Sequence, residues 1–127
     1  MKKYGFFILT FVAFSFFISA TLISESSKVP ETFPEDIRKI VEKSCFGCHN
    51  TDSQNEDAHE DLDFNKLNDL RKVKKITTLR EIAEVVEEGE MPPAKFLKKY
   101  PDKKLTDEEK VKLVEWAKKE SKALIGN

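Results

Sequence analysis

The feature that most constrains this chain is the segment KSCFGCHN at residues 43–50, which holds its only two cysteines, Cys45 and Cys48. His49 follows the second cysteine directly, and the only other histidine is His59. Thiolate and imidazole are ligands for a metal or a metal-containing group. A chain this short is marginal on its own hydrophobic core unless a metal, disulfides or a large apolar ligand completes that core. We therefore predict that a bound group forms part of the core.

The pattern C-x-x-C-H is the attachment signature of c-type haem. Two thiols three positions apart can reach the two vinyl groups on one edge of a porphyrin, and the next residue can bring its imidazole to the iron. Gly47 allows the backbone to approach the ring closely. The pattern predicts one covalently attached haem, with Cys45 and Cys48 as the attachment points and His49 as an axial ligand of the iron.

Three other interpretations of the cysteines fit less well. A structural zinc site could use Cys45, Cys48, His49 and His59, but such sites are closed by four ligands at characteristic spacings, and a histidine next to a cysteine is awkward there. A thioredoxin-like dithiol needs a βαβ context, which this sequence lacks. A disulfide between the two cysteines would close too short a loop to constrain much of the unfolded chain.

The second axial position of the iron is assigned to Met91, the only methionine after Met1. It lies in EEGEMPPAKF, residues 87–96, where two prolines fix φ, remove N–H donors and allow a loop to hold a thioether sulfur in place. Taken alone, a methionine in this context more often fills a gap in a core. The rival ligand is His59, which lies in an acidic stretch typical of an exposed loop, and a vacant position is the third alternative.

Helical periodicity and the lack of alternating β patterns predict an all-α domain with the haem in its core. A first helix is expected to begin at Pro34, with its apolar positions recurring on one face at Ile37, Ile40, Val41, Ser44 and Cys45. A weaker element is expected over residues 65–73, where leucine and valine recur every three positions. Phe46 and Trp116 are interpreted as core aromatics that pack near the porphyrin.

Two capping boxes predict the starts of two further helices. Thr78 with Glu81 would begin a helix that ends at Gly89. Thr106 with Glu109 would begin the last helix, which carries a broad apolar arc.

The first residues have the pattern of an export signal. Two lysines precede an apolar run from Phe6 to Ile18, and Ser19 and Ala20 follow it. The interpretation is a signal peptide at residues 1–23, with an uncleaved membrane anchor over residues 6–23 as the alternative. Residues 24–33, rich in Ser, Glu, Lys, Pro and Thr, are interpreted as a linker, and residues 34–125 as the haem-binding domain. The protein is therefore expected in the periplasm or another exported compartment.

The charge pattern excludes some functions and suggests a partner. Removal of residues 1–20 takes away 2 of the 22 basic residues and no acidic residue, so 20 basic and 23 acidic residues remain. Nucleic acid is therefore not an expected partner. No nucleophile with a base, phosphate-binding loop or pair of carboxylates in a defined pocket is recognisable, so the chain is not expected to be an enzyme. Two stretches are rich in basic residues, 71–75 and 95–104. They could steer an acidic redox partner, although such lysines more often form only a solvated surface.

Three segments together resemble the small haem-binding domain of exported bacterial proteins, within the class I cytochrome c-like group: PEDIRKIVEKSCFGCHN, LDFNKL, and VVEEGEMPPAKFLKKYPDKKLTDEEKVKLVEWAKKES. The resemblance covers most of residues 30–122 and implies covalent haem at Cys45 and Cys48, with His49 and Met91 as the proximal and distal ligands. It also implies that the first and last helices cross near the haem. One departure is that many members carry a Trp/Pro/Tyr-rich insertion after the attachment histidine, whereas residues 50–61 here are short and acidic.

Iron with protein ligands on both sides has no open coordination position, which favours outer-sphere electron transfer over oxygen or peroxide chemistry. The expected function is a monohaem c-type cytochrome that carries one electron between redox partner proteins, with a potential raised by the thioether. The alternative is a haem-based sensor in which a small ligand displaces Met91.

Overall fold

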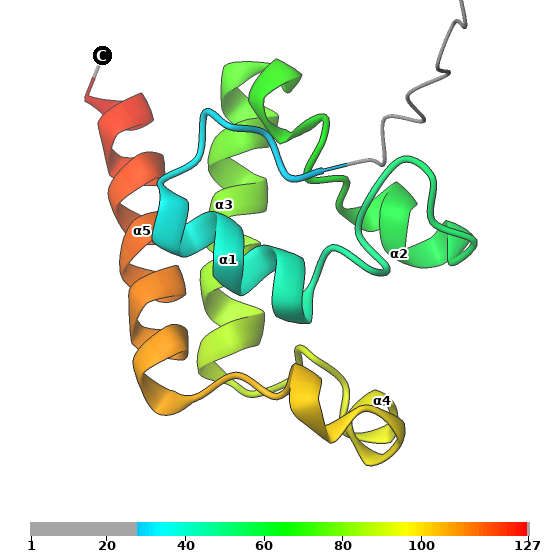
Figure 1. Cartoon of the computed structure of the whole chain (residues 1–127). Helices are drawn as coiled ribbons and strands as arrows, with labels where there is room; N and C mark the ends of the chain where they lie inside the picture. The colour runs from blue at the N-terminus through cyan, green and yellow to red at the C-terminus, as the bar shows by residue number, and fades with distance from the viewer. Residues whose placement is uncertain (1–27, 127) are drawn as a thin grey trace, which may run out of the picture.

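The computed structural model describes residues 28–126, and every regular element in that part of the chain is helical (Figure 1). The elements are α1 (Glu35–Ser44), α2 (Glu56–Asp61), η1 (Leu67–Asp69), α3 (Lys72–Glu87), α4 (Ala94–Lys99), η2 (Pro101–Lys103) and α5 (Asp107–Ile125), where η marks a short 3-10 helix. The described residues contain no β-strand, which confirms the predicted all-α class.

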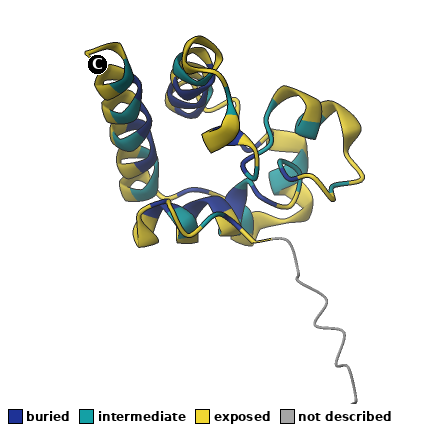
Figure 2. Ribbon diagram, turned by 90° about the horizontal axis from the view of Figure 1, so that it is seen from above, coloured by how far each residue is buried: buried dark blue, intermediate teal, exposed yellow. Residues whose placement is uncertain are grey.

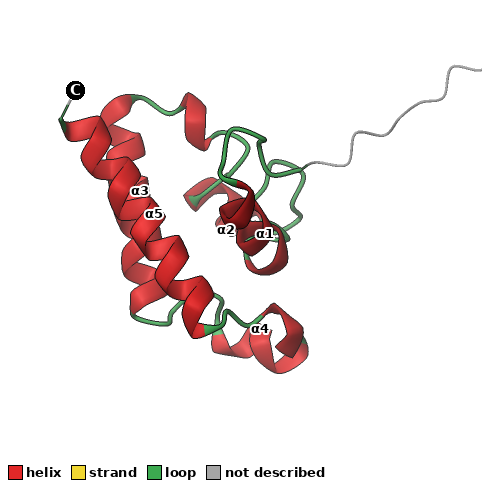
Figure 3. Ribbon diagram, turned by 60° about the vertical axis from the view of Figure 1, so that its left-hand side comes forward, coloured by secondary structure: helices red, strands yellow, loops and turns green. Residues whose placement is uncertain are grey.

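The core lies where α1 meets the long helices α3 and α5. Helices α3 and α5 pack side by side, and α1 crosses them (Figures 1 and 3). Their buried residues face inward (Figure 2), and the largest contributions to this core include Val41, Leu79 and Leu113, none of which is more than 1% exposed. Burial of one such side chain contributes roughly 1.5 to 3 kcal/mol. This three-helix contact therefore holds the domain together.

Helix α1 forms much as the sequence predicts. Pro34 is its N-cap, so the helix begins at Glu35, one residue later than expected. Acidic residues in the first turn and Lys43 in the last turn complement the helix dipole. Its buried face has the predicted spacing, with Ile37, Ile40, Val41 and Ser44. Cys45 is the C-cap, so the end of α1 delivers the first cysteine directly to the residues that follow.

The start of α3 differs from the prediction. The helix begins at Lys72, and Thr78 lies buried within it, so the capping box of Thr78 with Glu81 is wrong. The residues before Thr78 contain no proline or glycine, and the helix extends back through them to Arg71, which caps it without a side-chain hydrogen bond. The weaker element expected over residues 65–73 is the η1 turn followed by the first turn of α3. The predicted stop is confirmed, because Gly89 has φ +74° just after the helix end.

The capping box at the start of α5 is confirmed, and it also ties α5 to α1. The Thr106 hydroxyl accepts from the Glu109 N–H at 3.1 Å, and the Glu109 carboxylate accepts from the Thr106 N–H at 2.8 Å. The same carboxylate accepts hydrogen bonds from Nζ of Lys43 at 2.5 and 2.7 Å. Burial alone would raise the pKa of Glu109, but these hydrogen bonds outweigh it and hold that pKa below its ordinary value.

Glu109→Gln is expected to lower the free energy of unfolding by about 1 to 2 kcal/mol at neutral pH, because it weakens a helix cap and removes the ion pair with Lys43. Since the folded-state pKa of Glu109 is lowered, its contribution is present above the unfolded pKa and is lost as the pH falls through the folded value. Urea unfolding at several pH values measures both effects. Glu108→Gln, which removes only an exposed pair with Lys112, is the control and should change little. A pH-independent difference would contradict the assignment.

Two short helices were missing from the sequence prediction. Helices α2 and α4 have six residues each and no buried residue, so neither has an apolar stripe that a periodicity argument could detect. A capping signal was available for α2, because the side chain of Asn55 accepts from the N–H of Ala58 at 3.2 Å. Helix α4 follows directly on Pro93, its N-cap.

The packed domain begins before the predicted boundary at residue 34. Val29 and Phe33 are buried in the same core as α1, α3 and α5, so at least residues 29–33 of the expected linker belong to the domain. The expected signal or anchor at residues 1–23 lies outside the described residues. Within the described residues, no helix has the length and apolar character needed to span a bilayer.

Candidate functional site

A cavity of about 630 Å³ lies between the end of α1, helix α2, one face of α3 and the segment from Met91 to η2. Figures 1 and 3 show α2 and α4 on the same side of the molecule, separated from each other, and residues of both line this cavity. Its volume falls within the range of about 300 to 1,000 Å³ that is usual for sites that bury a small molecule or cofactor.

All four residues that the sequence singled out as haem ligands line this one cavity: Cys45, Cys48, His49 and Met91. His49 and Met91 are 42 positions apart in the sequence and reach it from different elements. The rival ligand His59 is absent from the wall of the cavity, and its Nδ1 lies 3.2 Å from the carbonyl oxygen of Ser53. The fold therefore brings together two thiols, one imidazole and one thioether, and leaves the second histidine outside.

The ring of His49 is held in one tautomer by the backbone of α2. Its Nδ1 lies 2.8 Å from the carbonyl oxygen of Ala58 and 3.1 Å from that of Leu62. A carbonyl can only accept, so Nδ1 carries the hydrogen and donates it. This leaves Nε2 of the neutral ring with its lone pair, which is the arrangement that metal-ligating histidines use. The ring is further fixed by edge contact with Phe64, at 6.4 Å between centroids.

The loop that carries Met91 is tied to the end of α3. The N–H groups of Glu90 and Met91 both donate to the carbonyl oxygen of Val85, at 2.9 and 3.2 Å. The Met91–Pro92 peptide bond is cis, and Pro92 is buried. Met91 itself is 37% exposed. The loop backbone is thus anchored while the thioether remains at the border between the cavity and solvent.

The two cysteines are free thiols in the structure, and no disulfide joins them. Burial of the Cys45 sulfur, and to a lesser extent the neighbouring Cys48, raises the pKa of Cys45 to about 12. Cys45 is therefore a neutral thiol at pH 7. Among the described residues, no group of three or more His, Cys, Asp or Glu side chains is arranged to hold a metal ion, so the alternative of a structural zinc site has no support in the geometry.

The rest of the wall suits a large apolar ligand. Its apolar side chains come from the segment after α2 and from α3, α4 and α5, and include Leu62, Phe64, Ile82, Val85, Val86, Phe96 and Leu113. Ser44 and Thr78 also belong to the wall, and their hydroxyls are buried without a hydrogen-bond partner. An apolar cavity with soft sulfur donors and one oriented imidazole fits a metalloporphyrin.

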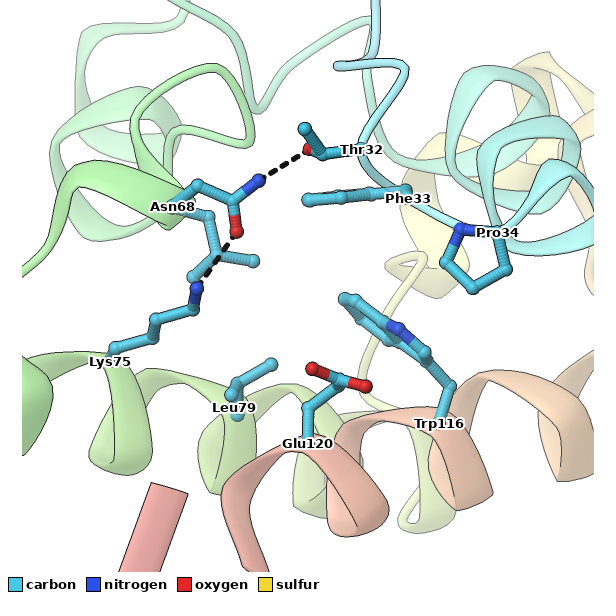
Figure 4. A pocket seen from close by; sticks show the side chains of 9 residues that line it. Thr32, Phe33, Pro34, Asn68, Lys75, Leu79, Trp116 and Glu120 are labelled. Atoms are coloured by element: carbon cyan, nitrogen blue, oxygen red, sulfur yellow. Dashed lines mark hydrogen bonds between the residues drawn. The ribbon is translucent and has the colours of Figure 1, made fainter. Parts of the chain in front are cut away.

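The two residues expected to be core aromatics near the porphyrin do pack in or against the core, but neither lines the main cavity. Phe46 is buried in the core, and Trp116 lines a second, smaller cavity of about 150 Å³ on another part of the surface (Figure 4). Trp116 packs against Phe33 at 5.2 Å between ring centroids, and Phe33 contacts Phe64 at 6.3 Å. Ring contacts thus run from Trp116 through Phe33 and Phe64 to His49, and of the three aromatic residues only Phe64 lines the main cavity.

Two residues important to the site were missed in the sequence. Phe64 packs on the His49 ring, and its N–H donates to the carbonyl oxygen of His49 at 3.2 Å. Asn50 is buried directly after the motif; its amide donates to the carbonyl oxygen of Phe46, and its Oδ1 accepts from the Asp52 N–H at 2.8 Å. The only sequence signal was the polar Asn50 beside the motif, because Phe64 looks like any other core aromatic.

An all-helical domain around an apolar cavity with these donors defines the class of small helical haem proteins. A family model described as a haem-binding domain matches residues 52–119, which are 68 of the 127 residues. The chain belongs to this haem-binding domain family.

The family match contains Met91, helices α2, α3 and α4 and the larger part of α5, but it begins after His49. The roles of Cys45, Cys48 and His49 therefore rest on the C-x-x-C-H pattern and on the geometry of the cavity. No curated protein and no solved structure matches the chain.

Proposed function

We propose that this protein is a monohaem c-type cytochrome that carries one electron. Cys45 and Cys48 would hold the haem covalently, and His49 and Met91 would ligate its iron from opposite sides. The observation that carries this proposal is that all four side chains line one apolar cavity, although they come from two distant parts of the sequence. The haem supplies the one-electron couple when it is bound.

Backbone hydrogen bonds orient the ring of His49 as an iron ligand. The carbonyls of Ala58 and Leu62 fix the hydrogen on Nδ1 and aim Nε2 away from α2. Hydrogen bonding at Nδ1 also fixes the orientation of the ring, which favours a bond from Nε2 to iron. A ligand already held in its binding orientation needs little rearrangement when the iron changes oxidation state, and that suits a carrier.

Met91 would supply the second axial ligand of the iron through its thioether sulfur. A thioether stabilises ferrous iron more than a second imidazole does, so this ligand set favours a relatively high reduction potential. The apolar wall acts in the same direction, because low polarity disfavours the extra positive charge of the ferric form. With both axial positions filled by the chain, no position is left for a substrate, and we do not assign the protein an enzymatic activity.

The absorption spectrum of the exported protein in both redox states tests the proposal. We expect c-type α and β bands in the reduced protein and a pyridine haemochrome typical of two thioether bonds. The mass of the intact protein should equal that of the polypeptide plus one haem. A spectrum without these bands, or the mass of the bare polypeptide, would reject the proposal.

A second candidate is a haem-based sensor in which a small molecule displaces Met91. The exposure of Met91 at the border of the cavity favours this alternative, since a ligand could reach the iron there without unfolding the core. Carbon monoxide distinguishes the two functions: rapid binding to the ferrous protein indicates a sensor, whereas an unchanged six-coordinate spectrum indicates a carrier.

The proposal includes export and exchange of electrons with other proteins. It places the chain in the periplasm or another exported compartment, either free after cleavage or tethered to the membrane by residues 6–23. Lys74 and Lys103 lie in the cavity wall and belong to the two basic stretches noted in the sequence. Electron transfer with redox partner proteins should then depend on ionic strength.

A further inference from the structure

The cavity is bordered by two groups of opposite charge. On the side of α2 lies an acidic rim of five residues: Asp52, Glu56, Asp57, Glu60 and Asp61. On the side of α4 and η2 lies a basic rim of five residues: Lys95, Lys98, Lys99, Lys103 and Lys104. Glu60 and Asp61 line the cavity from one rim and Lys103 from the other, so both rims border the same opening.

The charges of the two rims are largely unused within the molecule. None of the five acidic-rim carboxylates forms an ion pair within residues 28–126. In the basic rim, Lys103 lies 3.5 Å from the carboxylate of Asp102, and Lys99 stands over the ring of Tyr100 at 5.2 Å. The other three lysines of the basic rim are exposed and form no ion pair with the described residues. The α2 and α4 sides of the opening therefore offer unsatisfied charge of opposite sign.

Such a face is complementary to a copy of itself. In a two-fold symmetric contact, the patch that one subunit presents must also be the patch that it meets, so each residue pair occurs twice. A two-fold axis that lies in the plane of the contact and runs between the two rims would place the acidic rim of one copy on the basic rim of the other, and the reverse. A partner that was uniformly acidic would gain from the basic rim and be repelled by the acidic rim.

We propose that a second copy of this chain docks across the cavity opening, acidic rim to basic rim in both directions. The small formal net charge of the chain, −1, adds little general repulsion between copies. Contacts between exposed charges are individually weak and are screened by salt. The association is therefore reversible and strongest at low ionic strength, and it turns the two openings toward each other.

Sedimentation velocity of the intact protein, matured with its haem, tests this contact. We expect a concentration-dependent increase in sedimentation coefficient at an ionic strength of about 10 mM, where the Debye length is about 30 Å. The increase should disappear at about 1 M salt, where that length is about 3 Å. A protein that stays monomeric at millimolar concentration and low salt would overturn the proposal.

Two charge-reversed variants make the test specific. Glu60→Lys with Asp61→Lys leaves three carboxylates against two lysines in the acidic rim, which nearly cancels its charge, and puts cations in the last turn of α2, where the helix dipole tolerates them. Lys95→Glu with Lys104→Glu leaves three lysines against two carboxylates in the basic rim, which nearly cancels its charge, and Lys95 lies in the first turn of α4. Each variant alone should self-associate at least about tenfold more weakly than the unaltered protein, because the attraction that one of its two rims provides is nearly cancelled in both halves of the contact.

The decisive result comes from mixing the two variants. The unaltered basic rim of the first variant then faces the unaltered acidic rim of the second, so the mixture should associate more tightly than either variant does alone. Loss of folding cannot imitate this rescue, and a mixture that stays monomeric would overturn the proposal. Glu31→Lys with Glu115→Lys is the matched control, since it changes the net charge equally at exposed positions outside both cavities. Weakening by this control as well would show that net charge, and not the rims, governs association.

Discussion

Replacing both Cys45 and Cys48 with serine is expected to abolish covalent haem completely. The two thiols are the only ones in the chain, so no other residue can form a thioether bond to a vinyl group. The cavity of about 630 Å³ would then depend on axial ligands alone to retain a porphyrin. We expect the mass of the purified double variant to equal that of the polypeptide, and its helix content to be reduced because a part of the core is missing.

The single variants Cys45→Ser and Cys48→Ser are the controls for this result. Each keeps one thiol, so each should retain some haem through one thioether bond. The absorption maximum of the pyridine haemochrome should then differ from the position typical of two thioether bonds. The serine side chain is close to cysteine in size, so effects on packing alone should be small. Haem that survives denaturation in the double variant would show that another residue makes the attachment and would contradict our assignment.

Replacing Met91 with alanine should have the second largest effect, and it should leave the covalent haem in place. We expect the weak sulfur-to-iron band near the red end of the ferric spectrum to vanish. The reduction potential should fall by an amount of the order of 0.1 V, within the span of about 0.8 V that axial ligands produce. Carbon monoxide should then bind quickly, because one axial position has become free.

Lys95→Ala serves as the control for Met91→Ala, since it alters an exposed side chain in the same segment without touching the cavity. The sulfur-to-iron band and the reduction potential of Lys95→Ala should remain close to those of the unaltered protein. If the sulfur-to-iron band persisted in Met91→Ala, a different residue would have to ligate the iron, and the only other methionine is Met1.

The parts of the site that lie within one continuous segment could be predicted from the sequence. Local backbone geometry at the end of α1 places Cys45, Cys48 and His49. The spacing of the apolar residues of α1 could also be recognised in the sequence. Met91 could be singled out because it is the only methionine of its region and two prolines follow it. In both cases the pattern and the physical constraint occupy the same few residues.

The rest depended on contacts between segments that are distant in the sequence. The carbonyls that orient His49 belong to α2, a helix without an apolar face, and a backbone carbonyl carries no residue-specific signal. Thr78 with Glu81 looked as good a capping box as Thr106 with Glu109. Only the second is real, because α3 continues through Thr78, whereas Thr106 follows a loop. A local motif identifies a helix start only where the chain before it is not helical.

The burial of Val29 and Phe33 limits how far the domain could travel if residues 6–23 stayed in a bilayer. Only residues 24–28 would then connect the anchor to the first buried side chain. Five residues span at most about 18 Å when fully extended. The domain would therefore work as a short-range shuttle at the membrane surface, restricted to partners embedded in or seated on that same membrane, whereas cleavage after residue 20 would release it to diffuse freely.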